Sequence, residues 1–253
     1  MGMASQSSQI RSRLWALCLC LTAAVLAACS DGSDDNLNPG PYTVVITEQR
    51  YVDESRGTPA NGEIPALPSR TLDTLVFMPE GRDRFPLLIF SHGLGATPQA
   101  YASLIEEVAA AGFVVVAPAF PLTNTNTPGG VNPVDTEQQP GDVSFMIDTV
   151  IAAAAAGEPP FNRRVDIENI GTFGHSNGGI TTLSVMANSC CRDPRIDAAV
   201  SLSAPAAPFN NGEYDFTTSN PLAMVHGTED VLIPYEESVR VFNVVAAAKG
   251  ILT

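Results

Sequence analysis

The stretch Ile170-Gly171-Thr172-Phe173-Gly174-His175-Ser176-Asn177-Gly178-Gly179 decides the fold of this chain. Its first part, residues 170–173, is an apolar run that predicts a buried strand, and residues 177–188 predict a helix. Ser176 lies between the two in the pattern G-x-S-x-G. This pattern is typical of a tight strand-to-helix turn that presents a nucleophilic serine. Ser176 is therefore the candidate nucleophile, and the alternative is a serine in an ordinary glycine-rich turn.

From residue 42 onward, short apolar runs alternate with amphipathic stretches. This alternation is typical of an α/β fold, with a mostly parallel sheet and helices on both faces. The expected strands are residues 42–52, 70–78, 85–90, 113–117, 170–173, 198–202 and 221–225. The expected helices are residues 98–111, 142–156, 177–188 and 235–248.

A second motif, Ser91-His92-Gly93-Leu94-Gly95-Ala96, follows the expected strand at residues 85–90. Loops at this place supply one donor of an oxyanion hole, and the residue after the nucleophile supplies the other. We therefore expect the backbone N–H groups of Leu94 and Asn177 to bind the oxyanion of a tetrahedral intermediate. His92 is expected to brace its own loop rather than to act as a base.

A third motif, residues 226–234, follows the expected strand at residues 221–225 and reads HGTEDVLIP. In hydrolases with a G-x-S-x-G turn, the catalytic residues follow the order serine, acid, histidine along the chain. Asp230 is therefore the candidate acid that orients an imidazole. Its neighbour Glu229 is a rival for this role, and Asp230 as a solvated turn residue is the remaining alternative.

The N-terminal residues 1–28 have the features of an export signal, since Arg11 and Arg13 precede an apolar run at residues 14–26. The sequence Leu26-Ala27-Ala28-Cys29 resembles the lipobox of bacterial lipoproteins, which implies acylation of Cys29. The alternative is a plain secretory peptide. Residues 29–41 are rich in Asp, Asn, Gly and Pro, as in a flexible tether, and residues 42–253 form the expected folded domain. We expect export and lipid anchoring to a membrane of the bacterial cell envelope.

Acidic residues outnumber basic residues by 27 to 13, which gives a net charge of −14. A surface of this sign repels a phosphate backbone, so we expect no nucleic-acid partner. The adjacent cysteines Cys190 and Cys191 would form a strained disulfide, and their redox state stays open at this point.

With these motifs, the chain resembles the α/β-hydrolase superfamily over about residues 53–253. Within it, the chain resembles bacterial dienelactone-hydrolase-like proteins and platelet-activating-factor acetylhydrolases. The resemblance implies hydrolysis of small-molecule, lipid or polyester esters through an acyl-enzyme, with no metal or organic cofactor. The segments that carry it are residues 68–72, 91–96, 139–145 and 174–179.

The superfamily places its catalytic histidine after the acid, yet no histidine follows Asp230. The resemblance therefore implies a chain truncated at its C-terminus, with the last strand and the histidine loop missing and the 253 residues inactive. The alternatives are recruitment of His175 as the base and a catalytically silent surface lipoprotein that uses the fold for binding.

Residues 120–141 form a long segment without predicted structure. We expect this segment to form the rim of the site.

Overall fold

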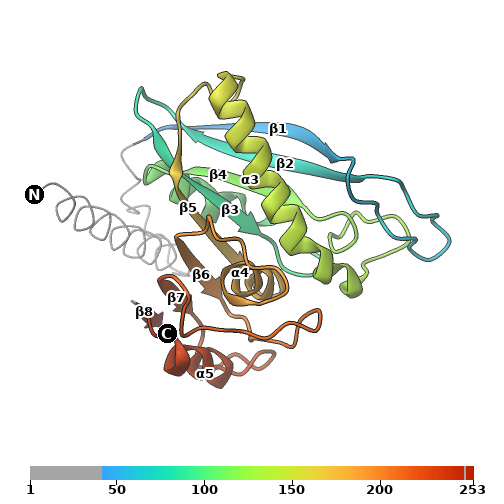
Figure 1. Cartoon of the computed structure of the whole chain (residues 1–253), viewed down its shortest axis with the longest axis vertical. Helices are drawn as coiled ribbons and strands as arrows, with labels where there is room; N and C mark the ends of the chain where they lie inside the picture. The colour runs from blue at the N-terminus through green and yellow to red at the C-terminus, as the bar shows by residue number, and fades with distance from the viewer. Residues whose placement is uncertain (1–41, 248) are drawn as a thin grey trace, which may run out of the picture.

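The computed structural model describes residues 42–247 and 249–253, so the expected signal peptide, the tether and Cys29 lie outside the described residues. The described chain forms one eight-stranded sheet in the order β1-β2-β4-β3-β5-β6-β7-β8 (Figure 1). The β1–β2 and β2–β4 pairs are antiparallel and the other pairs are parallel. The expected α/β-hydrolase fold with a mostly parallel sheet is confirmed. The strands are β1 (Val44–Asp53), β2 (Arg70–Pro79), β3 (Phe85–Ser91), β4 (Val114–Ala119), β5 (Val165–His175), β6 (Ala198–Leu202), β7 (Leu222–Val225) and β8 (Lys249–Leu252).

Helices cover both faces of the sheet, because neighbouring residues of each central strand face opposite sides. On one face, α2 packs through Ile105 and Val108. On the other face α3 runs across the strands with α4 beside it, and α5 lies beyond α4 near β7 and β8 (Figure 1). The helices are η1 (Pro98–Tyr101), α2 (Ala102–Ala110), η2 (Pro133–Gln138), α3 (Gln139–Ala156), α4 (Asn177–Ala187) and α5 (Glu236–Val244).

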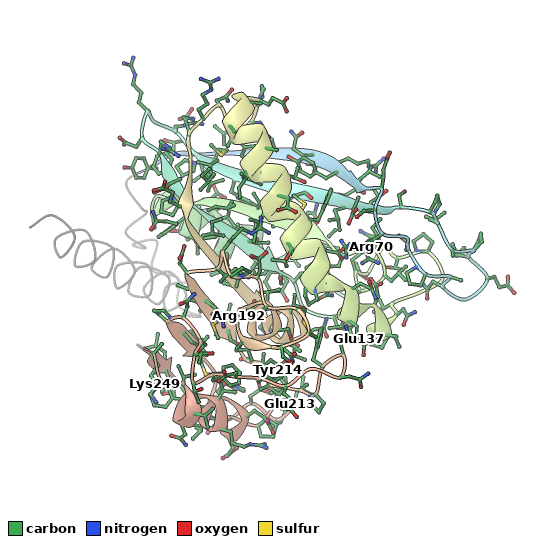
Figure 2. All side chains as sticks on the ribbon, in the orientation of Figure 1. Arg70, Glu137, Arg192, Glu213, Tyr214 and Lys249 are labelled. Carbon is green, nitrogen blue, oxygen red and sulfur yellow. A yellow bond between two sulfur atoms is a disulfide. The ribbon has the colours of Figure 1, made fainter. Side chains whose placement is uncertain are left out.

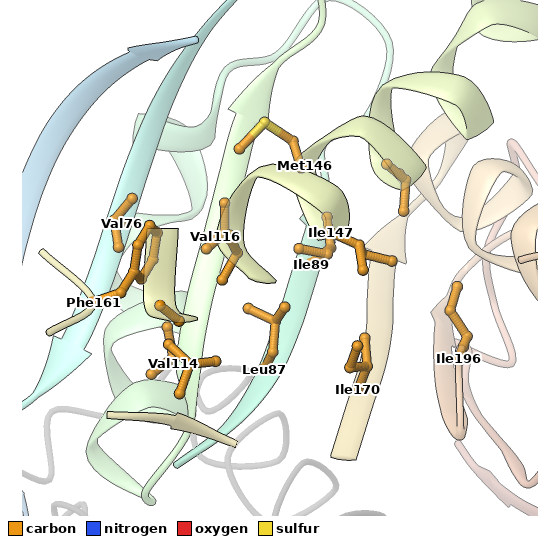
Figure 3. Close-up of a cluster of buried hydrophobic side chains, with 14 of the residues drawn as sticks. Val76, Leu87, Ile89, Val114, Val116, Met146, Ile147, Phe161, Ile170 and Ile196 are labelled. Atoms are coloured by element: carbon orange, nitrogen blue, oxygen red, sulfur yellow. The ribbon is translucent and has the colours of Figure 1, made fainter. Parts of the chain in front are cut away.

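The core beneath α3 is formed by branched side chains from the middle strands. Met146 and Ile147 of α3 lie over Leu87, Ile89 and Val116 of the sheet (Figure 3). All five side chains are completely buried. Close packing of this kind holds the strand ends, and the loops that leave them, in fixed positions.

The last strand expected to be missing is present as a short element. Residues Lys249–Leu252 form β8, which pairs in parallel with β7 at the edge of the sheet. No helix within residues 42–247 and 249–253 has the length and apolar content needed to cross a membrane.

The chain changes direction within the sheet between β3 and β5. From β3 the chain continues to β4 on one side, and from β5 it continues to β6 on the other side. The chain therefore leaves the carboxyl ends of these two strands in opposite directions. In open α/β sheets this switch point is where ligands bind.

A buried group of charges fastens the start of α3 to β2. The Arg70 guanidinium is completely buried and donates hydrogen bonds to both carboxylate oxygens of Asp135, at 2.9 and 3.0 Å. It also donates to both oxygens of Asp142, at 2.8 and 2.7 Å. Figure 2 shows Arg70 beside the first turn of α3. Burial alone would lower the pKa of Arg70, but the hydrogen bonds and charges of the two carboxylates outweigh it and raise the pKa.

Replacing Arg70 with methionine should lower the free energy of unfolding by about 3–5 kcal/mol, because it leaves the buried Asp135 without its cation and Asp142 with the partly exposed Arg56 alone. Urea unfolding followed by circular dichroism measures this change. Arg50→Met is the matched control, because Arg50 pairs with Asp73 by two hydrogen bonds on the exposed surface of β1 and β2. Its unfolding midpoint should stay near that of the wild type. Equal shifts in both variants would contradict the buried network as a source of stability.

The adjacent Cys190 and Cys191 form a disulfide in the loop after α4. The question that the sequence leaves open, their redox state, is answered for this structure. The loop also contacts the segment 209–214, since Ser189 N–H donates to Glu213 O at 2.9 Å.

Candidate active site

Ser176 occupies the turn between β5 and α4, where the sequence places it. Its φ of 54° and ψ of −120° are a conformation that a non-glycine residue adopts at an energetic cost. The Ser176 N–H donates a hydrogen bond to Leu202 O of β6 at 2.9 Å, which fixes the turn against the sheet. The strained turn holds Ser176 at the switch point, and the N-terminus of α4 adds positive potential there.

The turn and the loop after β3 are in direct backbone contact, and this contact explains the glycines in both motifs. A Cβ atom on Gly178 would lie 2.0 Å from Ser91 O, inside contact distance. A Cβ atom on Gly93 would lie 2.9 Å from Tyr101 Oη and 3.5 Å from the backbone oxygen of His175, next to Ser176. Any larger residue would push the loop after β3 away from α4. The glycines therefore keep Leu94 and Asn177 on neighbouring backbone segments.

The two expected oxyanion-hole donors share an unusual feature. Among residues 93–96, the other three backbone N–H groups donate to protein acceptors. These acceptors are Tyr101 Oη at 3.3 Å, Thr123 O at 2.8 Å and Gly93 O at 3.1 Å. The N–H of Leu94 has no acceptor within residues 42–247 and 249–253, and neither has that of Asn177, the first residue of α4. Both are available to an oxygen atom of a ligand.

Asp230 lies on the loop after β7, as the sequence predicts. Its Oδ1 accepts hydrogen bonds from the backbone N–H groups of Ile233, at 3.0 Å, and Leu232, at 2.9 Å. These bonds lower the pKa of Asp230, so the carboxylate is ionised at neutral pH. Its Oδ2 accepts no hydrogen bond from the described part of the chain and lies 3.5 Å from His226 Nε2. One carboxylate oxygen is thus held by backbone and the other can receive an N–H.

His175, the residue before Ser176, is half-buried and feels the charge of Asp230 on the loop after β7. Burial lowers the pKa of His175, and the negative charge of Asp230 partly opposes this shift. His175 Nδ1 lies 2.9 Å from Tyr101 Oη. The same hydroxyl accepts the N–H of Gly93 at 3.3 Å, so Tyr101 joins the loop after β3 to His175.

Both ring nitrogens of His92 and of His226 are engaged. His92 Nδ1 lies 2.9 Å from Gly93 O, and its Nε2 accepts the N–H of Phe120 at 3.0 Å. Burial lowers the pKa of His92 to about 4, so it is neutral and braces its loop as expected. His226 Nδ1 lies 2.7 Å from Ser238 Oγ, and its Nε2 donates to Ile233 O at 2.8 Å. None of the three histidines of the chain is hydrogen-bonded to Ser176.

A cavity of about 670 Å³ lies to the β1 and β2 side of the switch point. It is lined by residues of β1 and β2, of the segment 58–67, and of the segment 119–128. Neither Ser176 nor Asp230 lines it. Residues 120–141 were expected to form a rim without regular structure. This prediction is wrong for the second half, where residues 133–138 form η2 and residues 139–141 begin α3.

Several contacts near the site carry no signal in the sequence. Tyr101 joins the loop after β3 to His175, as described above. Thr136 of η2 donates through Oγ1 to Asn177 Oδ1 at 3.1 Å, and Gln139 reaches α4. These contacts join segments far apart in sequence, so no local pattern indicates them.

The comparisons with known proteins agree with this fold. A family model described as "Chlorophyllase" matches residues 46–206, well over half of the chain. The chain belongs to the chlorophyllase family. This is a family of carboxylic ester hydrolases within the α/β-hydrolase fold, and the matched part includes Ser176, Leu94 and Asn177. The narrower resemblance to dienelactone-hydrolase-like and platelet-activating-factor acetylhydrolase proteins stays a prediction.

Two curated relatives are "Chlorophyllase-1, chloroplastic" of Citrus sinensis and of Citrus unshiu. Each is 22% identical to this chlorophyllase-family chain over 121 residues, which cover 48% of this chain and 34% of the relative. The chain thus spans about a third of the length of these relatives. A solved structure, the ferulic acid esterase from Streptomyces cinnamoneus, superposes with a TM-score of 0.61 and 19% identity. The superposed part covers 87% of this chain and 74% of the esterase chain, and it shows a similar fold.

Proposed function

We propose that the protein is a serine hydrolase that cleaves carboxylic esters through an acyl-enzyme. The observation that carries this proposal is the position of Ser176. It lies in a strained turn at the switch point, beside the N–H groups of Leu94 and Asn177, which no atom of the described chain accepts. The family match and the names of the relatives, chlorophyllase and ferulic acid esterase, support an ester as substrate.

In the proposed reaction, Ser176 Oγ attacks the ester carbonyl carbon while a histidine accepts its proton. The carbonyl oxygen becomes an oxyanion, to which the N–H groups of Leu94 and Asn177 donate. The C–O bond to the alcohol then breaks, and the imidazolium returns the proton to the alcohol. Water, activated by the same imidazole, hydrolyses the acyl-enzyme and releases the acid. Asp230 Oδ2 orients the imidazole, and this chemistry uses no metal or organic cofactor.

The proposed base is none of the three histidines that this chain contains. His92 is braced by two backbone groups, and His226 donates to Ile233 O with one ring nitrogen and contacts Ser238 with the other. His175 is hydrogen-bonded to Tyr101. This assignment agrees with the order serine, acid, histidine, in which the base follows Asp230.

Covalent labelling with a fluorophosphonate probe tests the proposal, because the probe reacts only with a serine that is activated for attack. The full-length protein should label, and mass spectrometry should place the probe on Ser176. A His175→Gln protein should label as well, since His175 is not the proposed base. Absence of labelling in the full-length wild type would favour a silent surface lipoprotein. Loss of labelling in His175→Gln alone would make His175 the base.

We further propose that the protein is exported and anchored to a membrane of the bacterial cell envelope through acylated Cys29. The basis is the sequence Leu26-Ala27-Ala28-Cys29 after a positively charged and then apolar segment. A lipid anchor with more than one chain gives stable membrane attachment.

Metabolic labelling with palmitate should mark the wild-type protein and not a Cys29→Ala variant. Cys20→Ala is the matched control, because Cys20 lies within the apolar run of the signal and should leave labelling unchanged. Equal labelling of Cys29→Ala and wild type would rule out the anchor at this residue.

A further inference from the structure

The side chain of Gln139 joins two segments that support the proposed oxyanion hole. Gln139 is the first residue of α3 and is completely buried. Its Nε2 donates to Thr123 Oγ1 at 2.7 Å, and its Oε1 accepts from Thr181 Oγ1 of α4. One amide thus joins the segment after β4 to the helix after the nucleophile.

Each end of this bridge continues to one of the two N–H groups. Thr123 O accepts the N–H of Gly95, the residue after Leu94, at 2.8 Å. On the other side, Thr181 Oγ1 lies 3.4 Å from the carbonyl oxygen of Asn177. The distance between the Leu94 and Asn177 segments is therefore linked to the position of a single buried amide.

The chemistry of the amide suits this task. A glutamine side chain is both donor and acceptor and carries no charge, so it can satisfy two hydroxyl groups in a buried place without the cost of burying an ion. A carboxylate would lose the donor, and an aliphatic side chain would remove the partner of two buried hydroxyls.

The start of α3 is itself immobilised. Asp135 and Asp142, on either side of Gln139, are held by the buried Arg70. Arg56 adds a bond to Gln138 O at 3.1 Å. Gln139 thus reaches the site from a fixed support rather than from a mobile loop.

We infer that Gln139 is a positioning residue, which sets the separation of the Leu94 and Asn177 N–H groups so that both reach the same oxyanion. This inference rests on the proposed function and assigns no contact between Gln139 and the substrate. It predicts that breaking the bridge lowers transition-state binding while substrate binding is kept.

The kinetic test uses the full-length protein and p-nitrophenyl acetate. Gln139→Leu and Thr181→Val should each lower kcat roughly ten- to hundredfold, with KM within about twofold, because both donors leave their position. Thr181→Ser, which keeps the hydroxyl, should restore kcat. Thr182→Val is the matched control, since Thr182 is the next residue of α4, is also completely buried, and its hydroxyl has no hydrogen bond within the described residues. Its kcat should stay within about twofold of wild type.

Hydrogen exchange read by mass spectrometry tests the same bridge without turnover. Peptides that cover residues 93–96 and 177–181 should exchange faster in Gln139→Leu and Thr181→Val than in Thr182→Val. Equal kcat in the two threonine-to-valine variants, a loss that falls on KM, or unchanged exchange would overturn the inference. If hydrolysis persists in Ser176→Ala, the proposed function fails, while the exchange experiment still decides whether Gln139 holds the two segments.

Discussion

Replacing Ser176 with alanine should lower ester hydrolysis by the full-length protein about 10⁵- to 10⁶-fold, because the covalent path is lost and only binding and the oxyanion hole remain. The unfolding midpoint should change little, since the Ser176 contact described in the turn is made by its backbone N–H, which alanine keeps. Hydrolysis of p-nitrophenyl acetate at saturating substrate measures the effect on kcat.

Ser203→Ala is the control for this experiment. Ser203 also follows a parallel strand, β6, and has a φ of 46°, close to that of Ser176. The same substitution in the same kind of backbone should leave kcat within about twofold of wild type. A Ser176→Ala protein that keeps a tenth or more of the activity, or that loses no more than Ser203→Ala, would exclude Ser176 as the nucleophile.

The sequence was sufficient for the order of the strands β1 to β7 and the helices α2 to α5, because apolar runs and helical periodicity are local signals. The predicted strand at residues 198–202 coincides with β6. The strand at β5 is longer than predicted, since its first half contains Asp166 and Glu168 and meets β3 with an irregular register. The polar residues in this half give no strand signal in the sequence, and the strand forms there because it pairs with β3.

The boundaries of α3 and α5 differ from the prediction in opposite directions, because α3 is longer than predicted and α5 is shorter. The apolar period begins at Val143, which predicts a start at residue 142, but α3 begins at Gln139, with Pro140 in the first turn, where proline is tolerated. The predicted helix at residues 235–248 ends earlier, because α5 stops at Val244 and the chain turns toward β8. Local propensity indicates a helix in both places, and tertiary contacts decide its ends.

The candidate site divides in the same way. Ser176, Leu94, Asn177 and Asp230 lie in motifs that follow strands, so topology alone brings them to one edge of the sheet. The residues that support them do not. Arg70 meets Asp142 across 72 positions of sequence, and Gln139 meets Thr181 across 42. Such pairs depend on three-dimensional packing and have no signature in a single sequence.

Replacing Asp230 with asparagine should lower kcat about 10⁴-fold, because an amide nitrogen can donate where the carboxylate accepts and so favours the wrong imidazole tautomer. The backbone bonds from Leu232 and Ile233 can still be accepted by the amide oxygen, so the loop keeps its conformation. Fluorophosphonate labelling should slow with kcat, since the same serine must be activated in both reactions.

Glu229→Gln removes the negative charge of the residue next to Asp230. This variant distinguishes between the two candidate acids. Glu229 is exposed and takes part in no hydrogen bond or ion pair within residues 42–247 and 249–253, whereas Asp230 is held by two backbone N–H groups and has its second oxygen open. A fixed carboxylate can orient an imidazole, and a solvated one cannot do so without losing side-chain freedom. Glu229→Gln should therefore keep kcat within about twofold of wild type. If Glu229→Gln loses the activity and Asp230→Asn retains it, the acid is Glu229, and the loop must rearrange before hydrolysis.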